Sequence, residues 1–445
     1  YDNGARVFLL QKGMEADKNV MGLAKDAVKI FVDNTRISLS RISHNFFNKP
    51  SESLKIVGVT GTKGKTTITN YIATVLNEAG INTGVIGTNG TFFNGTYEVT
   101  ANTTPESYEL HRIFRKMLDN GVKCVSMEVS SGGIMQNRVE DVDFDVAIFS
   151  NLSPDHIGPK EHPTFEHYMK CKARLFKMAK HGIINVDDQY AKDIISEATC
   201  NIETFAIENK ANLTADNIRY SKEIDSLGVS FDCNTNDEKF PCFICSPGTF
   251  SIYNALAVIA VCIYLGVKRE VMVDALKTAK VSGRVEVLPI LPYATVVVDY
   301  AHNGVSLENI LQTLKNYDHE RLICLFGSVG GRTEIRRKEL GDVAARECDM
   351  AILTADNPDF EDPMNVINDI AQSFENSSCE VIKIADREEA IKYAVRNAKE
   401  GDMIVFAGKG HEKYQLINGE KVPFDEISIA KEEAKKVLEE RLLLV

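Results

Sequence analysis

Short runs of β-branched and other apolar residues alternate along the chain with longer segments of helix-like periodicity, beginning near residue 55. This alternation is typical of parallel sheets built from βαβ units. The stretch 200–250 alternates more weakly, and the apolar run 251–267 predicts a buried helix, since it is shorter than the ~20 residues that cross a bilayer. The predicted strands form two series: 55–60, 83–87, 124–129, 146–150 and 183–186, then 295–300, 322–327, 350–355, 380–384 and 403–407.

The two series predict an α/β protein with two doubly wound, mostly parallel sheets. Residues 1–50 are too short for a full α/β domain, so we expect a partial N-terminal region there. A central α/β domain is expected at 51–287, and a Rossmann-like C-terminal domain at 288–445. The Asn-Lys-Pro-Ser segment at 48–51 is predicted to be a linker.

Polar residues follow the C-terminal ends of many predicted strands. Glu128 ends one strand of the first series, and a segment that closes on His156 follows another. In the second series Asp299 and His302 stand at one strand end and Asp356 at another. Each residue could simply cap the next helix. Ligands of open α/β sheets bind outside these strand ends, so the recurrence in both series predicts a functional edge on each sheet.

The sequence Gly-Val-Thr-Gly-Thr-Lys-Gly-Lys-Thr-Thr at 58–67 lies between a predicted strand and a predicted helix. A strict phosphate-loop pattern would have glycine in place of Val59. Gly61 and Gly64 nevertheless allow backbone N–H groups to turn toward an anion at the helix N-terminus, and Lys65 adds a positive charge. A chance loop containing lysine is the alternative. The flanking elements favour a nucleotide site.

A triphosphate is bound with magnesium, and Thr66 is placed to reach that ion. Glu128 and His156 are the expected further ligands, although either could be a structural polar residue. Cys242 and Cys245 have the spacing of a zinc-binding pair but no second pair, so a plain strand is favoured there.

The formal net charge of −12 argues against nucleic-acid binding, which needs clustered Lys and Arg to neutralise phosphates. Ten cysteines at irregular spacing suit a reducing cytosol. No signal peptide opens the sequence at Tyr1. We therefore expect a cytoplasmic protein without a membrane span.

Nine spaced motifs resemble those of the Mur ligases, and within that family the muramyl-tripeptide synthetases. They occur in the family's order: TGTKGKTT at 60–67, NTTP at 102–105, MEVSS at 127–131, NLSPDH at 151–156, YMKCKARLF at 168–176, SGRVEV at 282–287, DYAH at 299–302, DNPD at 356–359 and AGKGHE at 407–412. The resemblance implies a monomeric, ATP- and Mg²⁺-dependent amide-forming ligase of peptidoglycan synthesis. Its implied partners are UDP-MurNAc-L-Ala-D-Glu and a free amino acid, joined through an acyl phosphate. The resemblance also implies that 1–50 is an incomplete substrate-binding region, 51–287 the central ATP-binding domain with its phosphate loop, and 288–445 the C-terminal Mur ligase domain.

The resemblance also implies roles for individual residues. ATP binding is implied for Gly61, Thr62, Lys63, Gly64, Lys65, Thr66, Thr67, Asn254, Arg284, Asp299 and His302. Muropeptide binding is implied for Asn102, Thr103, Thr104, Ser130, Gln136 and Arg138. Binding of the incoming amino acid is implied for Arg332, Asp356, Asn357, Asp359, Gly408 and Glu412. Metal binding is implied for Thr66, Glu128, His156 and Lys172, and a catalytic role for Lys65, Lys172, Glu128, His156 and Arg332. Lys172 matches the family's carbamylated lysine; by sequence alone it is one of many helical lysines, most often solvated.

Asp359 departs from the family pattern, because the diaminopimelate-adding members carry arginine there to bind the distal carboxylate. A carboxylate at this position favours L-lysine or another basic diamino acid, unless Asp359 only caps the helix after Pro363 or faces water. A meso-diaminopimelate-adding ligase is one alternative. A Mur-like ligase with another acceptor, similar to folylpolyglutamate synthase, is a second, and a non-catalytic nucleotide-binding paralogue is a third.

Overall fold

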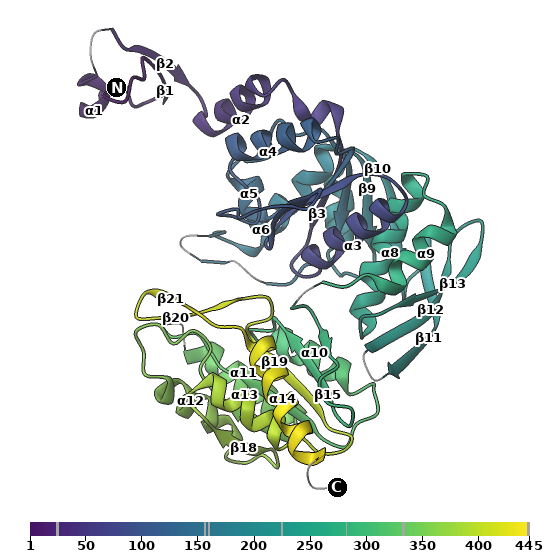
Figure 1. Cartoon of the computed structure of the whole chain (residues 1–445). Coiled ribbons are helices and arrows are strands. Elements are labelled where there is room, and N and C mark those ends of the chain that lie inside the picture. Colours follow the sequence, from purple (N-terminus) through teal and green to yellow (C-terminus); the bar gives the residue numbers. More distant parts are fainter. Residues whose placement is uncertain are drawn as a thin grey trace. The chain divides into compact units, whose positions relative to one another are not determined.

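The computed structural model describes residues 1–23, 26–154, 157–158, 161–223, 226–281, 283–331 and 334–442 (Figure 1). The chain divides into two compact units. The first comprises Tyr1–Thr214 and Leu256–Met272, and the second comprises Ala215–Ala255 and Val273–Val445. Across the described ranges, no helix is long and apolar enough to cross a membrane. The predicted domain boundaries stay a prediction.

The first unit contains a mostly parallel sheet whose strands run in the order β10-β9-β8-β3-β7-β4-β5-β6. Val59 of β3 pairs with Glu128 of β7, and Thr60 pairs with Phe149 of β8. This register brings the C-terminal ends of three neighbouring strands to one edge. The strands are β3 (Lys55–Thr60), β4 (Thr83–Gly87), β5 (Gly90–Phe93), β6 (Thr96–Glu98), β7 (Cys124–Glu128), β8 (Phe144–Phe149), β9 (Ala179–Asn185) and β10 (Asn201–Ala206).

Helices of the first unit bury apolar residues against this sheet. Phe114 of α4, Ile134 of α5 and Tyr168 of α6 share a core with Met127 and Phe149 of the strands. The helices are α3 (Lys65–Glu78), α4 (Ser107–Asp119), α5 (Ser131–Met135), α6 (Phe165–Ala173) with a 3₁₀ turn η2 (Arg174–Lys177), and α7 (Ala191–Glu197). The predicted apolar helix is α8 (Thr249–Tyr264), and α9 (Arg269–Thr278) follows it; the first unit includes only Leu256–Met272 of this part of the chain.

The N-terminal region forms its own small elements before the sheet. β1 (Val7–Gln11) pairs in parallel with β2 (Val28–Val32), and α1 (Lys18–Met21) lies between them in sequence. α2 (Thr35–Phe46) follows and leads into η1 (Pro50–Ser53). The predicted linker at 48–51 is an ordered turn, since Asn48 and Lys49 both adopt positive φ angles and Pro50 and Ser51 are buried.

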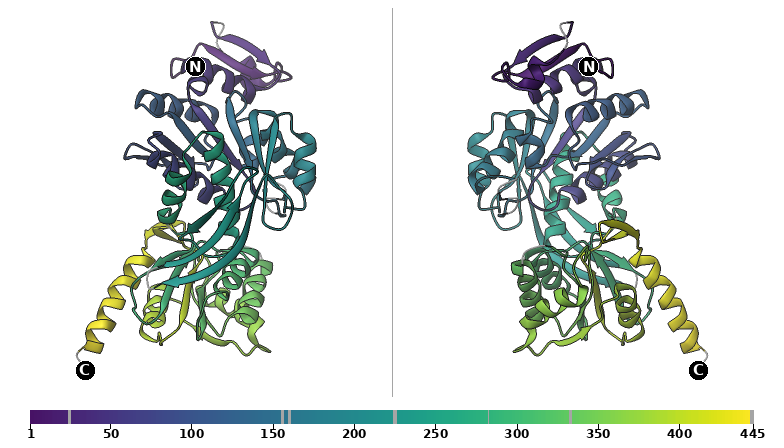
Figure 2. Two further views of the ribbon diagram at one scale, coloured as in Figure 1. Left: turned by 90° about the vertical axis from the view of Figure 1, so that its right-hand side faces the viewer. Right: turned by 90° about the vertical axis from the view of Figure 1, so that its left-hand side faces the viewer.

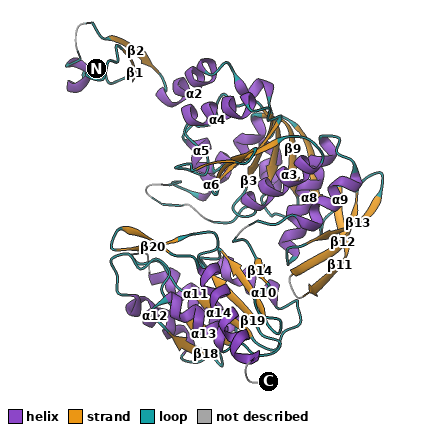
Figure 3. Cartoon of the chain, in the orientation of Figure 1, coloured by secondary structure: helices purple, strands orange, loops and turns teal. Residues whose placement is uncertain are grey.

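The second unit is built on a sheet of order β14-β15-β19-β16-β17-β18, parallel except for β14. Figure 3 draws its strands in orange and its helices in purple. Alternate strand residues point to opposite faces. Val297 packs in one core with α10, α11 and α12, while Val296 and Val298 pack in another with α13 and α14. Helices therefore cover both faces, which confirms the predicted doubly wound α/β fold. The strands are β14 (Glu286–Leu288), β15 (Thr295–Asp299), β16 (Leu322–Phe326), β17 (Met350–Leu353), β18 (Glu380–Lys383) and β19 (Met403–Ala407).

Five α-helices, an antiparallel strand pair and a hairpin complete the described part of the second unit. Its helices are α10 (Gly304–Leu314), α11 (Glu334–Glu347), α12 (Pro363–Ala371) with η3 (Gln372–Phe374), α13 (Arg387–Arg396) and α14 (Glu426–Leu442), the yellow helix near the C-terminus in Figure 2. β12 (Ser226–Asn234) and β13 (Lys239–Ile244) form an antiparallel pair, and β11 (Leu213–Glu223) precedes them. β20 (Tyr414–Ile417) and β21 (Glu420–Pro423) form an antiparallel hairpin.

A buried ion pair supports the functional edge of the second sheet. Arg387, at the start of α13, contacts Glu426, at the start of α14, with Nη2 2.9 Å from Oε2, and neither side chain is exposed by more than 1%. The same Nη2 donates to the carbonyl oxygen of Ala407 at 2.9 Å. The guanidinium therefore ties two helix starts to the end of β19. Burial raises the pKa of Glu426, opposed by the charge of Arg387.

We expect the substitution Arg387→Met to lower the free energy of unfolding by about 3–5 kcal/mol, because it leaves the Glu426 carboxylate buried without its partner. Chemical denaturation followed by circular dichroism measures this. The double variant Arg387→Met/Glu426→Leu should recover most of the loss. Lys338→Met, which breaks the exposed pair with Asp342 on α11, is the matched control and should change stability little. A single variant as stable as the wild type would contradict the prediction.

Candidate active site

Two glycines shape the loop that joins β3 to α3. Gly61 has a φ of +150° and Gly64 a φ of +86°. A Cβ atom on Gly61 would lie 2.0 Å from Ser150 Oγ and 3.2 Å from the backbone nitrogen of Asn151, so a larger residue does not fit there. The Lys63 N–H donates to Asn151 Oδ1 at 2.8 Å, which fixes the loop against the end of β8. Thr67 is half-buried in the first turn of α3. The predicted phosphate loop therefore has the required strand, turn and helix.

Two lysine ammonium groups converge on this loop. Lys65 Nζ donates to the carbonyl oxygens of Gly61 at 2.9 Å and Thr62 at 3.1 Å. Lys172 Nζ, from α6, also donates to the Gly61 carbonyl at 2.9 Å. Lys172 is only 1% exposed and lies 4.5 Å from the centre of the Tyr168 ring. The reading of Lys172 as an ordinary solvated helical lysine is therefore wrong.

Glu128 is buried at the end of β7 and accepts several hydrogen bonds. Thr66 Oγ1 donates to its Oε1 at 2.9 Å, and the Thr88 N–H donates to the same oxygen at 2.9 Å. Hydroxyl and carboxylate oxygens are the ligands that Mg²⁺ prefers, so Thr66 and Glu128 fit the expected metal. His156 lies outside the described residues, and its predicted role stays a prediction.

The residues expected to bind the muropeptide adjoin Glu128. Thr104 Oγ1 donates to the backbone oxygen of Glu128 at 3.0 Å and to Ser130 Oγ at 3.1 Å. Arg138 Nη1 donates to the Thr104 carbonyl at 2.9 Å, and its Nη2 donates to Gln136 Oε1 at 2.7 Å. One connected network thus links this group to the phosphate loop.

Two further members of the muropeptide group stand just before Thr104. Thr103 Oγ1 lies 3.1 Å from Thr88 Oγ1, and Asn102 is half-buried. The hydroxyl of Thr88 also donates to Glu128 Oε2 at 3.3 Å. Thr103 is therefore connected to Glu128 through Thr88, a residue that sequence reasoning missed.

In the second unit Asp299 ends β15 and is buried. Its Oδ2 accepts from the Val285 N–H at 2.9 Å. Burial raises the pKa of the Asp299 carboxyl, and the charge of Arg284 acts in the opposite direction. The Arg284 guanidinium lies 4.7 Å from the centre of the Tyr300 ring. His302 Nδ1 is 2.8 Å from the Tyr300 carbonyl oxygen, so three of the predicted nucleotide contacts cluster around Tyr300.

A buried lysine organises the group expected to bind the amino acid. Lys409 Nζ donates to Asn357 Oδ1 at 2.5 Å and to Glu412 Oε2 at 3.2 Å, and it lies 3.4 Å from Asp356 Oδ1. Sequence reasoning missed Lys409. Its signal was the position between two glycines in AGKGHE, where Gly408 has a φ of +111° and a Cβ would approach Asp356 Oδ2 to 3.5 Å.

The Tyr300 hydroxyl donates to Glu412 Oε1 at 3.3 Å and so joins the nucleotide group and the amino-acid group of this unit. Asn254 is buried within α8. Arg332 lies outside the described residues. Its predicted roles therefore stay predictions.

Asp359 lines a cavity of about 470 Å³ in the second unit, together with Glu361, Asp362, Asp386 and Gln415. Asp359 has a φ of +52°, and its side-chain Oδ1 accepts a hydrogen bond of 2.8 Å from the Gly419 N–H in the β20–β21 turn. Asp359 therefore anchors the hairpin. It does not cap α12, whose N-terminal cap is Asp362.

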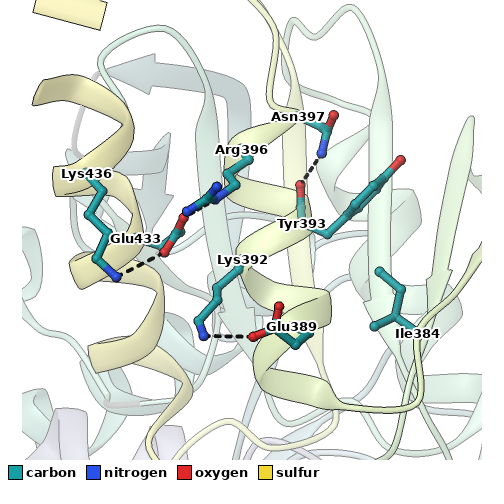
Figure 4. A pocket seen from close by; sticks show the side chains of 8 residues that line it. All are labelled: Ile384, Glu389, Lys392, Tyr393, Arg396, Asn397, Glu433 and Lys436. Carbon is teal, nitrogen blue, oxygen red and sulfur yellow. Dashed lines mark hydrogen bonds and ion pairs between the residues drawn. The ribbon is translucent and has the colours of Figure 1, made fainter. Parts of the chain in front are cut away.

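A second cavity, of about 590 Å³, lies between α13 and α14 and contains none of the predicted site residues (Figure 4). Its cations are paired: Lys392 contacts Glu389, and Arg396 and Lys436 contact Glu433. In the described part of the chain, the cluster of metal-capable side chains does not include Cys242 or Cys245. Cys242 lies within β13, as expected for a plain strand.

The nucleotide loop, the acidic strand ends and the two sheets define an ATP-dependent ligase of the Mur type, and the comparisons with known proteins agree. The family model for the Mur ligase middle domain matches residues 59–262, and the model for the Mur ligase glutamate ligase domain matches residues 283–410. The chain belongs to the Mur ligase family and is an ATP-dependent acid–amino-acid ligase.

Its relatives include two named UDP-N-acetylmuramoyl-L-alanyl-D-glutamate–2,6-diaminopimelate ligase. The protein of Caldanaerobacter subterraneus subsp. tengcongensis is 39% identical, with 91% of this chain and 83% of the relative covered. The protein of Clostridium botulinum is 38% identical, with 98% of this chain and 89% of the relative covered. A solved structure of a ligase of the same name superposes with a TM-score of 0.71 at 28% identity, covering 97% of this chain and 92% of the other.

We expect Asp299→Asn to raise the free energy of unfolding at pH 7 by about 1–2 kcal/mol, because the amide avoids the cost of burying a charge and can still accept from Val285. The raised pKa means that Asp299 lowers stability as the pH rises through its folded-state pKa. The difference between variant and wild type should therefore shrink toward pH 3.8, the ordinary value for this group. Urea denaturation across this pH range measures it. A variant less stable at pH 7 would contradict the prediction.

Proposed function

We propose that this ligase adds the third amino acid of the peptidoglycan stem peptide to UDP-MurNAc-L-Ala-D-Glu, in the cytoplasm. In this reaction a carboxylate of the acceptor attacks the γ-phosphorus of ATP, ADP leaves, and an acyl phosphate forms. The amine of the incoming amino acid then attacks the acyl carbon, and phosphate leaves. The observation that carries the proposal is the hydrogen-bonded network from the phosphate loop through Glu128 to Thr104 and Arg138.

The arrangement in the first unit supports distinct roles for its residues. The loop N–H groups and Lys65 are placed to bind the phosphates of ATP. Thr66 and Glu128 would hold Mg²⁺, which when bound disperses the negative charge of the transferring phosphoryl group. Ser130 and Arg138 would position the acceptor beside them.

The buried position of Lys172 supports carbamylation of its side chain. Its Nζ lies at the Gly61 carbonyl, inside the phosphate loop. The ammonium first loses one proton; attack of the neutral amine on CO₂ then forms one N–C bond, opens one C=O π bond and releases a second proton, so that a cation becomes a carboxylate. Such a group would add an oxygen ligand near Thr66 and Glu128. It would also remove the positive charge of Lys172, which would repel a bound Mg²⁺ ion.

The incoming amino acid is better supported as meso-diaminopimelate than as L-lysine. The relatives at 36–39% identity are named for 2,6-diaminopimelate. A basic amino acid would need the Asp359 carboxylate to face it, and that carboxylate already accepts a hydrogen bond from the hairpin turn. L-Lysine remains the second candidate, because the cavity beside Asp359 is lined by four carboxylates, which favour a cation.

These four carboxylates are already engaged in local interactions. Glu361 pairs with Arg337, and Asp386 caps α13. Asp362 caps α12. Their hydrogen bonds spread the negative charge over neighbouring backbone and guanidinium groups, which weakens the repulsion that a second ligand carboxylate would meet.

We expect ADP and phosphate release to depend on UDP-MurNAc-L-Ala-D-Glu together with an amino acid, with kcat/KM for meso-diaminopimelate about tenfold or more above that for L-lysine, a difference of ~1.4 kcal/mol. A coupled ADP assay with both amino acids, and with none, measures this. Lys65→Ala is the control and should abolish turnover. Higher kcat/KM with lysine would establish the second candidate. No ADP release with either amino acid would support another acceptor or a non-catalytic nucleotide-binding protein.

We expect Asp359→Asn to leave the fold intact and to lower KM for meso-diaminopimelate a few-fold, because it removes a like charge from the cavity. Asparagine tolerates a positive φ and can still accept from Gly419. Asp362→Asn is the matched control: it removes a charge from the same cavity and keeps the helix cap. Loss of lysine turnover in Asp359→Asn alone would instead identify Asp359 as a contact for a basic amino acid.

A further inference from the structure

Three side chains with metal-binding atoms meet where the chain enters α6. His162 is buried just before the helix, and His167 and Cys171 are half-buried on it. His167 and Cys171 are four positions apart, so they lie on one face of the helix, one turn from each other. The ligand atoms of all three residues lie within 4.8 Å of one another, the one such cluster in the described ranges.

The two imidazoles face each other through their Nδ1 nitrogens. His162 Nδ1 and His167 Nδ1 are 2.9 Å apart, so one proton is shared between the two nitrogens. Cys171 Sγ lies 3.9 Å from His167 Nδ1. A metal ion bound at about 2.0–2.1 Å from nitrogen and about 2.3 Å from sulfur needs separations of roughly 3.4–3.6 Å between ligand atoms. The two printed separations of 2.9 Å and 3.9 Å bracket this range.

Ser131 gives the cluster the outer hydrogen bond that metal-binding histidines commonly have. Its Oγ lies 2.9 Å from His162 Nε2, at the first residue of α5. With the proton on Nε2 donated to this hydroxyl, Nδ1 presents its lone pair to the cluster. The serine therefore fixes the ring orientation of His162 and is compatible with the tautomer that a metal ligand requires, since its hydroxyl can accept this proton.

We propose that His162, His167 and Cys171 form a binding site for a divalent transition-metal ion of the zinc type, separate from the expected magnesium site. Two imidazoles and a thiolate suit zinc, whereas magnesium prefers carboxylate, hydroxyl and water oxygens such as those around Glu128. On binding, Cys171 loses its thiol proton to solvent, and the proton shared by the imidazoles moves to the outer nitrogen of His167. Water completes the fourth position.

The two sites share α6 but use different faces of it. Lys172 follows Cys171 directly, and successive residues of a helix are rotated by about 100°. The Lys172 side chain reaches the Gly61 carbonyl in the phosphate loop, whereas Cys171 approaches His167. A zinc ion would cross-link the segment at His162 to the first turns of α6 and so restrict the helix that carries Lys172.

The test is zinc binding by the full chain, measured by competition with a chromophoric chelator, and cobalt substitution, which gives a thiolate-to-metal charge-transfer band. We expect one zinc ion per chain that excess magnesium does not displace. Cys171→Ser and His167→Gln should each weaken zinc binding roughly a hundredfold or more and, for Cys171→Ser, remove the charge-transfer band. Ser131→Ala should weaken binding about tenfold as a positioning residue.

Cys200→Ser is the matched control, because Cys200 is a half-buried cysteine of the same unit outside the cluster. It should bind zinc as the wild type does. Circular dichroism and thermal unfolding without metal check that each variant is folded. Absence of zinc binding by the wild-type chain, or binding that survives both Cys171→Ser and His167→Gln in folded protein, would overturn the proposal. Equal loss in Cys200→Ser would do the same.

Discussion

The hydrogen bond between Thr66 Oγ1 and Glu128 Oε1 holds the first turn of α3 at the end of β7, and the site of the first unit is arranged around it. The side chain of Glu128 contacts the phosphate loop, and its backbone oxygen accepts from Thr104 of the expected muropeptide group. One buried residue therefore couples the part that would bind ATP to the part that would bind the acceptor. Group transfer requires such coupling, because the reacting atoms must be held within bonding approach.

The sequence predicted the strands and helices of the sheets well where they repeat as βαβ units. β3, β4 and β19 have the predicted bounds, because buried parallel strands appear as continuous apolar runs. The β5–β6 and β20–β21 hairpins were not predicted. β21, for example, is exposed throughout and carries no apolar pattern. Its position depends on contacts such as Gly419 with Asp359, which lie far apart in sequence.

The candidate site could be predicted where a motif imposes a backbone geometry, and not where burial decides the role of a side chain. Gly61 and Gly64 follow from the loop pattern alone. The signal for Lys409, its position between two glycines, is weak, because it is equally compatible with a lysine exposed to solvent. The structure buries it among Asn357, Glu412 and Asp356, where its charge offsets two carboxylates. Asp359 shows the opposite case. Its difference from the family pattern suggested specificity for a basic amino acid, but the structure pairs its carboxylate with the Gly419 N–H of the hairpin turn.

The neighbourhood of α6 separates two kinds of cation chemistry by ligand type. Oxygen atoms from Thr66 and Glu128 stand on the loop side, where a hard ion such as magnesium is expected. Nitrogen and sulfur atoms from His167 and Cys171 stand on another face. Because a hard ion gains little from imidazole or thiolate, and zinc gains much, the two positions can select different ions at close range. This difference in ligand atoms would let one helix carry both Lys172, the predicted catalytic lysine, and the proposed zinc ligands without competition between the two ions.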